Sequence, residues 1–379
     1  MAADRLAHRA TPASTHHGRR RAAEGDGVVP GHAPEREGGS GDGGRDRAPS
    51  GGVEGDREQH ACGAPVSRRG AIPRSAAGWW ERPTDLHDRS QVVTVQIAHI
   101  GDLHFGGLAD VPVVEALERM LPDLRPDAIV IGGDLSQRAR HGELQRGRAF
   151  ANLCRETAPV LVIPGNHDVQ WWHRPLIPFG KDALYAKYRS YFGADLTPTL
   201  TIPGGAVIAT ALTAHGVAWG SLTARLRDVA VKGHLPKREM QRVQAIFAQA
   251  EPGLPRVLVI HHNLLRGQIS GRMGLARWRQ AQRRVVEAGT DVVLCGHDHE
   301  EGAELLDGRV TVSTAGTLST RARGGRPVSF NFVTIDPTAV QVTFFRWDSA
   351  KRRFQPSDTA AFARRASSKA PSLEPQAAQ

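Results

Sequence analysis

Five short polar clusters, each close behind an apolar run, limit what this chain can fold into more than any other feature. The apolar runs are rich in Val and Ile, which is typical of buried strands. In open α/β folds the carboxyl ends of the strands collect the reactive groups, so we expect the clusters to meet at one edge. The clusters are Asp102-Leu103-His104, Gly133-Asp134, Gly165-Asn166-His167-Asp168, His261-His262 and Gly296-His297-Asp298-His299.

Helical and strand patterns alternate around these clusters. Apolar side chains recur at helical spacing over 111–124, which predicts an amphipathic helix there. Pro236 predicts the start of another helix, because proline is favoured in the first helical turn. Further helices are expected over 141–154 and 275–288, strands over 93–100, 128–131, 160–163, 206–209, 257–260 and 292–294, and antiparallel strands over 309–315, 328–335 and 340–347. This order predicts an α/β fold, in which helices cover a parallel sheet.

Composition divides the 379 residues into three parts. Residues 1–90 contain only seven Leu, Ile, Val or Phe among many Gly, Arg and Pro, so we expect a disordered N-terminal extension. Residues 91–350 carry the five clusters and are expected to form one domain. Residues 351–379 are polar and predict a disordered C-terminal tail.

Bulk properties argue against several classes of protein. No run of about 18 apolar residues is present, so no membrane span is expected. Cys62, Cys154 and Cys295 are too widely spaced for a disulfide framework or a thiolate zinc site, which favours a cytoplasmic location. The net charge of +10 comes from dispersed residues, mostly Arg, so nucleic acid is a possible but not a favoured partner. A basic surface would help attract a small anionic substrate. The oligomeric state is left open.

The clusters consist almost entirely of groups that bind metals. Carboxylate, amide oxygen and imidazole together suit divalent ions such as Mn, Fe or Zn. This many donors exceeds what one tetrahedral ion needs and suits two ions that share a ligand, an arrangement used for phosphoester hydrolysis. Asp102 and His104 are two residues apart, so on an extended segment both would face the same side. Taken alone, Asp102 would be a turn or cap residue and His261 a core histidine; the order of all five clusters favours metal binding.

In this order the clusters resemble the signature of the calcineurin-like metallophosphoesterase superfamily, D-x-H, G-D, G-N-H-[DE], H and G-H-x-H, over about 95–320. The resemblance implies a four-layer αββα sandwich with a dinuclear metal site at the carboxyl ends of the strands. It also implies that His167 is catalytic and donates a proton at the phosphate, with Asp168 orienting it. The implied ligands are Asp102, His104, Asp134 and His299 for one ion, and Asp134, Asn166, His261 and His297 for the other, with Asp134 bridging.

Within the superfamily, the His261-His262 pair resembles the class III cyclic-nucleotide phosphodiesterases, although Asn263 stands where these usually have Pro. The resemblance implies a phosphodiester substrate, such as a 3',5'-cyclic nucleotide, attacked by a hydroxide that bridges the two ions. A DNA nuclease of the same superfamily and a non-catalytic, metal-dependent scaffold are the alternatives. Trp171 and Trp172 could stack on a nucleotide base or simply pack beneath their loop.

Overall fold

The computed structural model describes residues 93–170, 181–215 and 232–364. The predicted extension 1–90 and the pair Trp171-Trp172 lie outside the described residues. The helices are α1 (Val111–Leu124), α2 (His141–Thr157), α3 (Lys181–Phe192), α4 (Lys237–Ala248) and α5 (Trp278–Glu287). The strands are β1 (Val95–Ile100), β2 (Ala128–Ile131), β3 (Val160–Val162), β4 (Thr199–Ile202), β5 (Ala206–Thr210), β6 (Arg256–His262), β7 (Val292–Gly296), β8 (Gly302–Leu306), β9 (Val310–Thr314), β10 (Ser329–Ile335), β11 (Ala339–Asp348) and β12 (Arg353–Ala363).

Within the described ranges the strands form two six-stranded sheets. The first has the order β12-β11-β10-β1-β2-β3, and the second has the order β4-β5-β6-β7-β9-β8. Strands β1, β2 and β3 run parallel, as do β5, β6, β7 and β9, and the outer strands pair antiparallel. The strands that carry the five clusters therefore lie in two parallel groups, β1–β3 and β6–β7.

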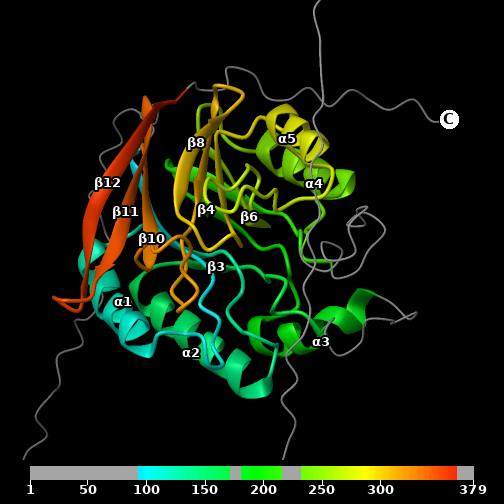
Figure 1. The fold of residues 1–379 in the computed structure, drawn as a ribbon. Coiled ribbons are helices and arrows are strands. Elements are labelled where there is room, and N and C mark those ends of the chain that lie inside the picture. The colour runs from blue at the N-terminus through cyan, green and yellow to red at the C-terminus, as the bar shows by residue number, and fades with distance from the viewer. Residues whose placement is uncertain (1–92, 171–180, 216–231, 365–379) are drawn as a thin grey trace, which may run out of the picture. The chain divides into compact units, whose positions relative to one another are not determined.

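Three apolar layers hold sheets and helices together. Between the two sheets lies a buried cluster of Val, Ile and Leu side chains from both, including Ile97 and Ile208. Helices α1 and α2 cover the outer face of the first sheet through Leu117 and Phe150. Helices α4 and α5 cover the second sheet, and Phe247 of α4 is fully buried against it. This order of helices, sheet, sheet and helices confirms the predicted four-layer sandwich (Figure 1).

Helix α1 shows why the central elements could be predicted. It has the expected bounds, and Val113, Leu117 and Leu121 form one buried stripe at four-residue spacing. By contrast, β8 gives no strand signal, because Leu306 is its only buried side chain. Strand β9 was expected to be antiparallel, but it pairs in parallel with β7 and antiparallel only with β8.

The C-terminal limit of the domain lies beyond the predicted boundary at residue 350. Strand β12 pairs antiparallel along the length of β11, and Phe354 is buried in the layer beneath α1. The prediction of a tail over 351–379 is therefore wrong for its first part. The reason is that β12 is an edge strand whose side chains are mostly exposed, so its polar composition resembles that of a tail. Residues 365–379 lie outside the described ranges.

Candidate metal centre

The five polar clusters meet, as predicted, where their strands end. Asp102 follows β1, Asp134 follows β2, Asn166 follows β3 and His297 follows β7. His261 differs slightly, because it lies within the last two residues of β6 rather than after the strand. The side chains of Asp102, Asp134, Asn166 and His261 are buried, and the ring of His297 packs against that of His261. These five residues come together where strands β1–β3 and strands β6–β7 end.

A first set of donor atoms converges around His104. Its Nε2 atom lies 2.9 Å from Nε2 of His299. Asp102 Oδ1 lies 3.4 Å from Nε2 of His299 and 3.7 Å from Nε2 of His104. Asp134 Oδ2 lies 3.8 Å from His104 Nε2. Two imidazole nitrogens and two carboxylate oxygens therefore surround one point.

A second set converges around His261. Its Nε2 atom lies 3.2 Å from Oδ1 of Asn166 and 3.3 Å from Oδ2 of Asp134. The ring of His297 lies 5.2 Å from the ring of His261, measured between centroids. Asp134 Oδ2 thus belongs to both sets, which is the geometry that a bridging ligand requires.

Hydrogen bonds from the backbone orient these donors. Nδ1 of His261 lies 2.8 Å from the carbonyl of Gly132, so it donates there and leaves Nε2 to face Asp134. The backbone N–H of His167 donates to Oδ1 of Asp134, and that of His297 donates to Oδ2 of Asp102. Each carboxylate therefore uses one oxygen to fix its position and turns the other toward the two donor sets.

The residues fit two divalent ions. Asp102 Oδ1 and Asp134 Oδ2 are buried and have no hydrogen-bond donor in good geometry among the described residues; imidazole nitrogens face them at 3.3–3.8 Å. A buried carboxylate oxygen without a partner is costly unless a cation lies nearby. Oxygen and imidazole donors in this mixture suit Mn, Fe or Zn. The two sets can therefore hold one ion each.

The ionisation of the buried groups also indicates a site for cations. Burial opposes ionisation of Asp102, but the imidazoles of His104 and His299 hold its pKa well below the ordinary value. The pKa of Asp134 is likewise lowered despite burial, chiefly by the charge of His261. Burial would lower the pKa of His261, but Asp134 raises it to about 9. Without metal, a proton on His261 offsets part of the buried negative charge, so binding of a metal by His261 would release a proton.

Left-handed backbone places most of the donors. Asp102, His104, Asp134, His297 and His299 have φ values between 50° and 78°, a region that side chains other than glycine rarely adopt. Such strained residues concentrate at functional sites. The expectation that Asp102 and His104 face one side because their segment is extended is wrong in its reason: left-handed backbone at both residues brings their side chains together. Gly133, directly before Asp134 in the turn after β2, has a φ of +100°, and a Cβ there would collide with the backbone of Gly165.

His167 lies beside the first donor set, with its ring 4.9 Å from that of His104. Its Nδ1 atom lies 2.8 Å from the carbonyl of Gln137, which fixes the ring. Burial lowers the pKa of His167, against the charge of Asp134. The expectation that Asp168 orients His167 is wrong: the Asp168 carboxylate accepts hydrogen bonds from the backbone of Leu135, Ser136 and Gly165 and from the Ser136 hydroxyl.

Asp168 instead ties together two loops that carry donors. By binding Ser136 and Gly165 it joins the turn after β2, which contains Asp134, to the turn after β3, which contains Asn166. Burial and then the charge of Asp134 raise the pKa of Asp168 to about 6. Gln137 and Ser136 have no sequence signal of their own, because one acts through a carbonyl and the other beside a common turn.

Asn263 is a further residue whose position explains a departure from the expected pattern. Its amide donates to Oδ2 of Asp298 at 3.0 Å, and its oxygen accepts from the backbone of Leu265. The amide thus links the end of β6, which carries His261, to the turn that carries His297. A proline at this position would have neither group.

Comparison with known proteins places this geometry in a family. The sequence model described as "Calcineurin-like phosphoesterase" matches residues 95–301, more than half of the chain. The match confirms the superfamily and the class of metal-dependent phosphoester hydrolase expected from the motifs. No described helix is long and apolar enough to cross a membrane.

Similar proteins share part of the sequence or the fold. The glycerophosphodiester phosphodiesterase GpdQ from Enterobacter lignolyticus (strain SCF1) is 36% identical over 109 residues, which cover 24% of this chain and only 38% of that protein. The structure of PhoD aligns with a TM-score of 0.52 and 12% identity, over 73% of this chain and 70% of that one. A dimetal phosphatase from Danio rerio aligns with a TM-score of 0.50 and 13% identity, over 72% and 99%. These structural likenesses show the fold.

Proposed function

The chain belongs to the calcineurin-like phosphoesterase family, and we propose that it hydrolyses phosphodiesters with two divalent ions bound at the carboxyl ends of its strands. The observation that carries this proposal is the position of Asp134 Oδ2. This one oxygen lies 3.3 Å from Nε2 of His261 and 3.8 Å from Nε2 of His104, so it can serve both donor sets at once. Two adjacent metals are a device for displacement at phosphorus.

Seven residues would hold the ions. Bound there, the two ions would neutralise the charge of a phosphoester and lower the pKa of an attacking water. The proposed ligands of one ion are Asp102, His104, Asp134 and His299, and those of the other are Asp134, Asn166, His261 and His297.

His167 is proposed as the proton donor to the leaving oxygen. Its Nδ1–H is committed to the carbonyl of Gln137, so the proton that it transfers would be held at Nε2. Its backbone N–H also fixes Asp134, and the ring borders the first donor set. Asp168 contributes by positioning the two turns rather than by touching the substrate.

A small diester is the proposed substrate class, with 3',5'-cyclic nucleotides and glycerophosphodiesters as candidates. The His261-His262 pair supports the first, and the region of identity with a glycerophosphodiester phosphodiesterase supports the second. A net charge of +10 would favour any anionic substrate. Mn, Fe and Zn remain the proposed metals, and a cytoplasmic location remains a proposal from the cysteine usage.

The proposal is tested by assaying the purified, Mn²⁺-loaded protein on a panel of phosphoesters. The panel comprises bis-p-nitrophenyl phosphate, p-nitrophenyl phosphate, a 3',5'-cyclic nucleotide, glycerophosphocholine and DNA. Turnover of the diesters above that of the monoester, lost on chelation and restored by Mn²⁺, is the expected result. Activity confined to the monoester or to DNA would overturn the proposed substrate class, and two bound metals without turnover of any ester would favour the scaffold alternative.

A further inference from the structure

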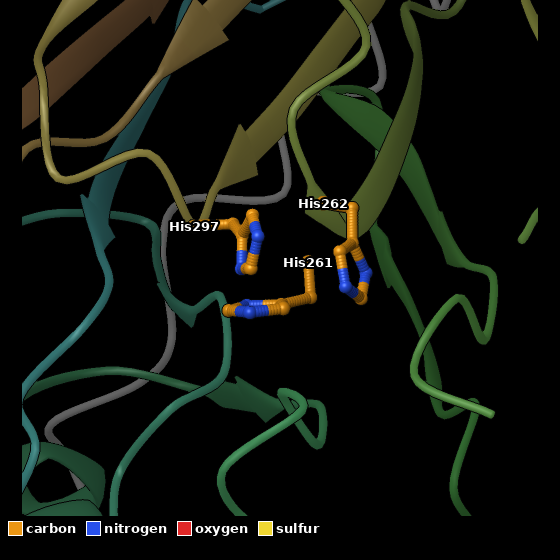
Figure 2. Close-up of side chains that lie close together, drawn as sticks. All are labelled: His261, His262 and His297. Atoms are coloured by element: carbon orange, nitrogen blue, oxygen red, sulfur yellow. The ribbon is translucent and has the colours of Figure 1, made fainter. Parts of the chain in front are cut away.

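His262 is a buried imidazole that the proposed chemistry leaves without a role. It follows His261 directly on β6, where consecutive side chains normally point to opposite faces of a sheet. Yet its ring lies 4.9 Å from the ring of His261 and 4.5 Å from that of His297. Figure 2 shows the three rings around a common space.

An irregularity in the strand explains this placement. Val259 pairs with Leu294, whereas His262 pairs with Gly296. Between these two pairs β6 contains one residue more than β7, which makes a β-bulge. An extra residue of this kind re-aims the side chains next to it, and such bulges are frequent beside active sites. The bulge lets both histidines of the pair approach His297.

The hydroxyl of Thr213 fixes which nitrogen of His262 carries the proton. Thr213 Oγ1 lies 2.8 Å from Nδ1 of His262 and accepts the backbone N–H of the same residue at 3.4 Å. Thr213 is 1% exposed, and within the described part of the chain Nδ1 of His262 is the acceptor that its hydroxyl hydrogen can reach. The hydroxyl therefore donates to Nδ1, and the ring proton resides on Nε2.

The backbone of Gly233 also packs closely against the ring of His262. A Cβ at this position would overlap Nδ1 and Cγ of His262, so only glycine permits the approach. The Gly233 backbone is itself held, by hydrogen bonds to Gly274 and Ala276 at 2.9 Å. The imidazole of His262 is thus confined by a hydroxyl and by a fixed stretch of backbone, as expected for a preorganised group.

Nε2 of His262 has no hydrogen-bond partner among the described residues, although the residue is 1% exposed. One ring nitrogen from each of His261, His262 and His297 lies within 4.8 Å of the other two. With Nδ1 engaged by Thr213, the N–H at Nε2 is the group left to meet a ligand. An N–H donor in this place suits an anionic oxygen.

We propose that His262 contacts the substrate, donating a hydrogen bond from Nε2 to an oxygen of the phosphate, and that Thr213 is the positioning residue that holds the donating tautomer. The inference rests on the proposed function for the identity of the phosphate as substrate. It goes beyond that function because His262 acts here as a donor and not as a metal ligand. A ligand role would require the lone pair at Nε2 and hence the opposite tautomer.

Three variants separate these roles. His262→Gln keeps an amide N–H near the position of Nε2, His262→Leu keeps the bulk without a donor, and Thr213→Val removes only the hydroxyl. We expect all three to retain two Mn²⁺ equivalents. The affinity of the Mn²⁺-loaded protein for inorganic phosphate, measured by calorimetry, should fall about 10- to 100-fold in His262→Leu, less in Thr213→Val, and least in His262→Gln. His141→Gln, an exposed histidine on α2, should change nothing.

A second measurement does not depend on metal or turnover. In metal-free protein labelled with ¹⁵N-histidine, long-range NMR should show His262 protonated at Nε2, and Thr213→Val should disturb this signal. Loss of a metal equivalent in His262→Leu, phosphate affinity equal to wild type in that variant, or a proton on Nδ1 would each overturn the inference. Phosphate affinity that depends on His262 in a protein without diesterase activity would sink only the proposed function.

Discussion

The layer between the two sheets and the edge above it follow opposite rules. The layer consists of aliphatic side chains such as Ile97, Val259 and Ile208, which are fully buried and lie on regular strands. The edge, a few residues further along the same strands, buries charged groups and leaves oxygens of Asp102 and Asp134 without a well-placed hydrogen-bond donor. It also holds the backbone in left-handed conformations. Each strand therefore begins by stabilising the fold and ends by straining it.

The contrast teaches that stability and chemistry are separated along each strand rather than between domains. Burial of aliphatic surface is the dominant favourable contribution to folding. Buried carboxylates and left-handed turns cost free energy, and they persist because the layer beneath holds the strands in register. Substitutions at the edge should consequently change metal content and turnover, whereas substitutions in the layer should change the free energy of unfolding.

The largest effect is expected for Asp134→Asn. The amide cannot neutralise two ions, so the variant should lose metal and all diesterase activity while remaining folded. Metal analysis and turnover of bis-p-nitrophenyl phosphate provide the measurement, with the exposed Asp123→Asn as matched control. Two retained equivalents with normal turnover would remove the bridging role of Asp134 and much of the contrast between edge and layer.

His167→Ala should lower turnover by roughly 10²- to 10⁴-fold, the range for loss of a general acid. Metal content should stay at two equivalents, because the ring is proposed as a donor and not as a ligand. The loss should shrink for an ester whose leaving group needs little protonation, which a series of substituted phenyl diesters can establish. A missing metal equivalent would show instead that the ring of His167 belongs to the first donor set.

Ile208→Ala tests the layer. Removing a fully buried aliphatic side chain should lower the free energy of unfolding by about 2–5 kcal/mol, whereas the metal stoichiometry and the turnover of the folded protein should remain near wild type. Urea unfolding followed by circular dichroism gives the first quantity. Leu200→Ala, at a half-buried position of β4, should cost less. If Ile208→Ala releases metal without unfolding the protein, the two regions are not separate.

The smallest effect is expected when residues 1–90 are removed. This stretch has only seven Leu, Ile, Val or Phe, too little apolar surface to offset the entropy of ordering it. The midpoint of thermal unfolding and the turnover of the shortened protein should match those of the full chain. A large fall in the midpoint would mean that part of the extension packs on the domain and supplements the layer.

The predictable part of the fold and site is the part written in local patterns. Buried stripes gave the bounds of α1, and a polar cluster after each Val- and Ile-rich run located Asp102, Asp134, Asn166 and His297 at strand ends. Strand β12 could not be found in this way, because an edge strand with one exposed face has the composition of a tail.

Contacts between distant segments account for what the sequence could not reveal. Most partners of the Asp168 carboxylate belong to Leu135 and Ser136, more than thirty residues earlier in the chain, so its position beside His167 suggested the wrong contact. Gln137 orients His167 through a carbonyl, which every residue possesses. The left-handed backbone at Asp102 and His104 is set by their place in the assembled edge, because aspartate and histidine tolerate this region but seldom adopt it on their own.

The pairing of β1 with β10 also bears on how the protein is made. In the first sheet Val95, among the earliest residues of the domain, is registered against Ile335, and Asp102 meets His299. Synthesis proceeds from the N-terminus, so β1 must wait for this neighbour until residue 335 has left the ribosome. The complete donor set also needs His299, so a growing chain cannot present it until most of the domain has been made, and loading of both ions would follow that point.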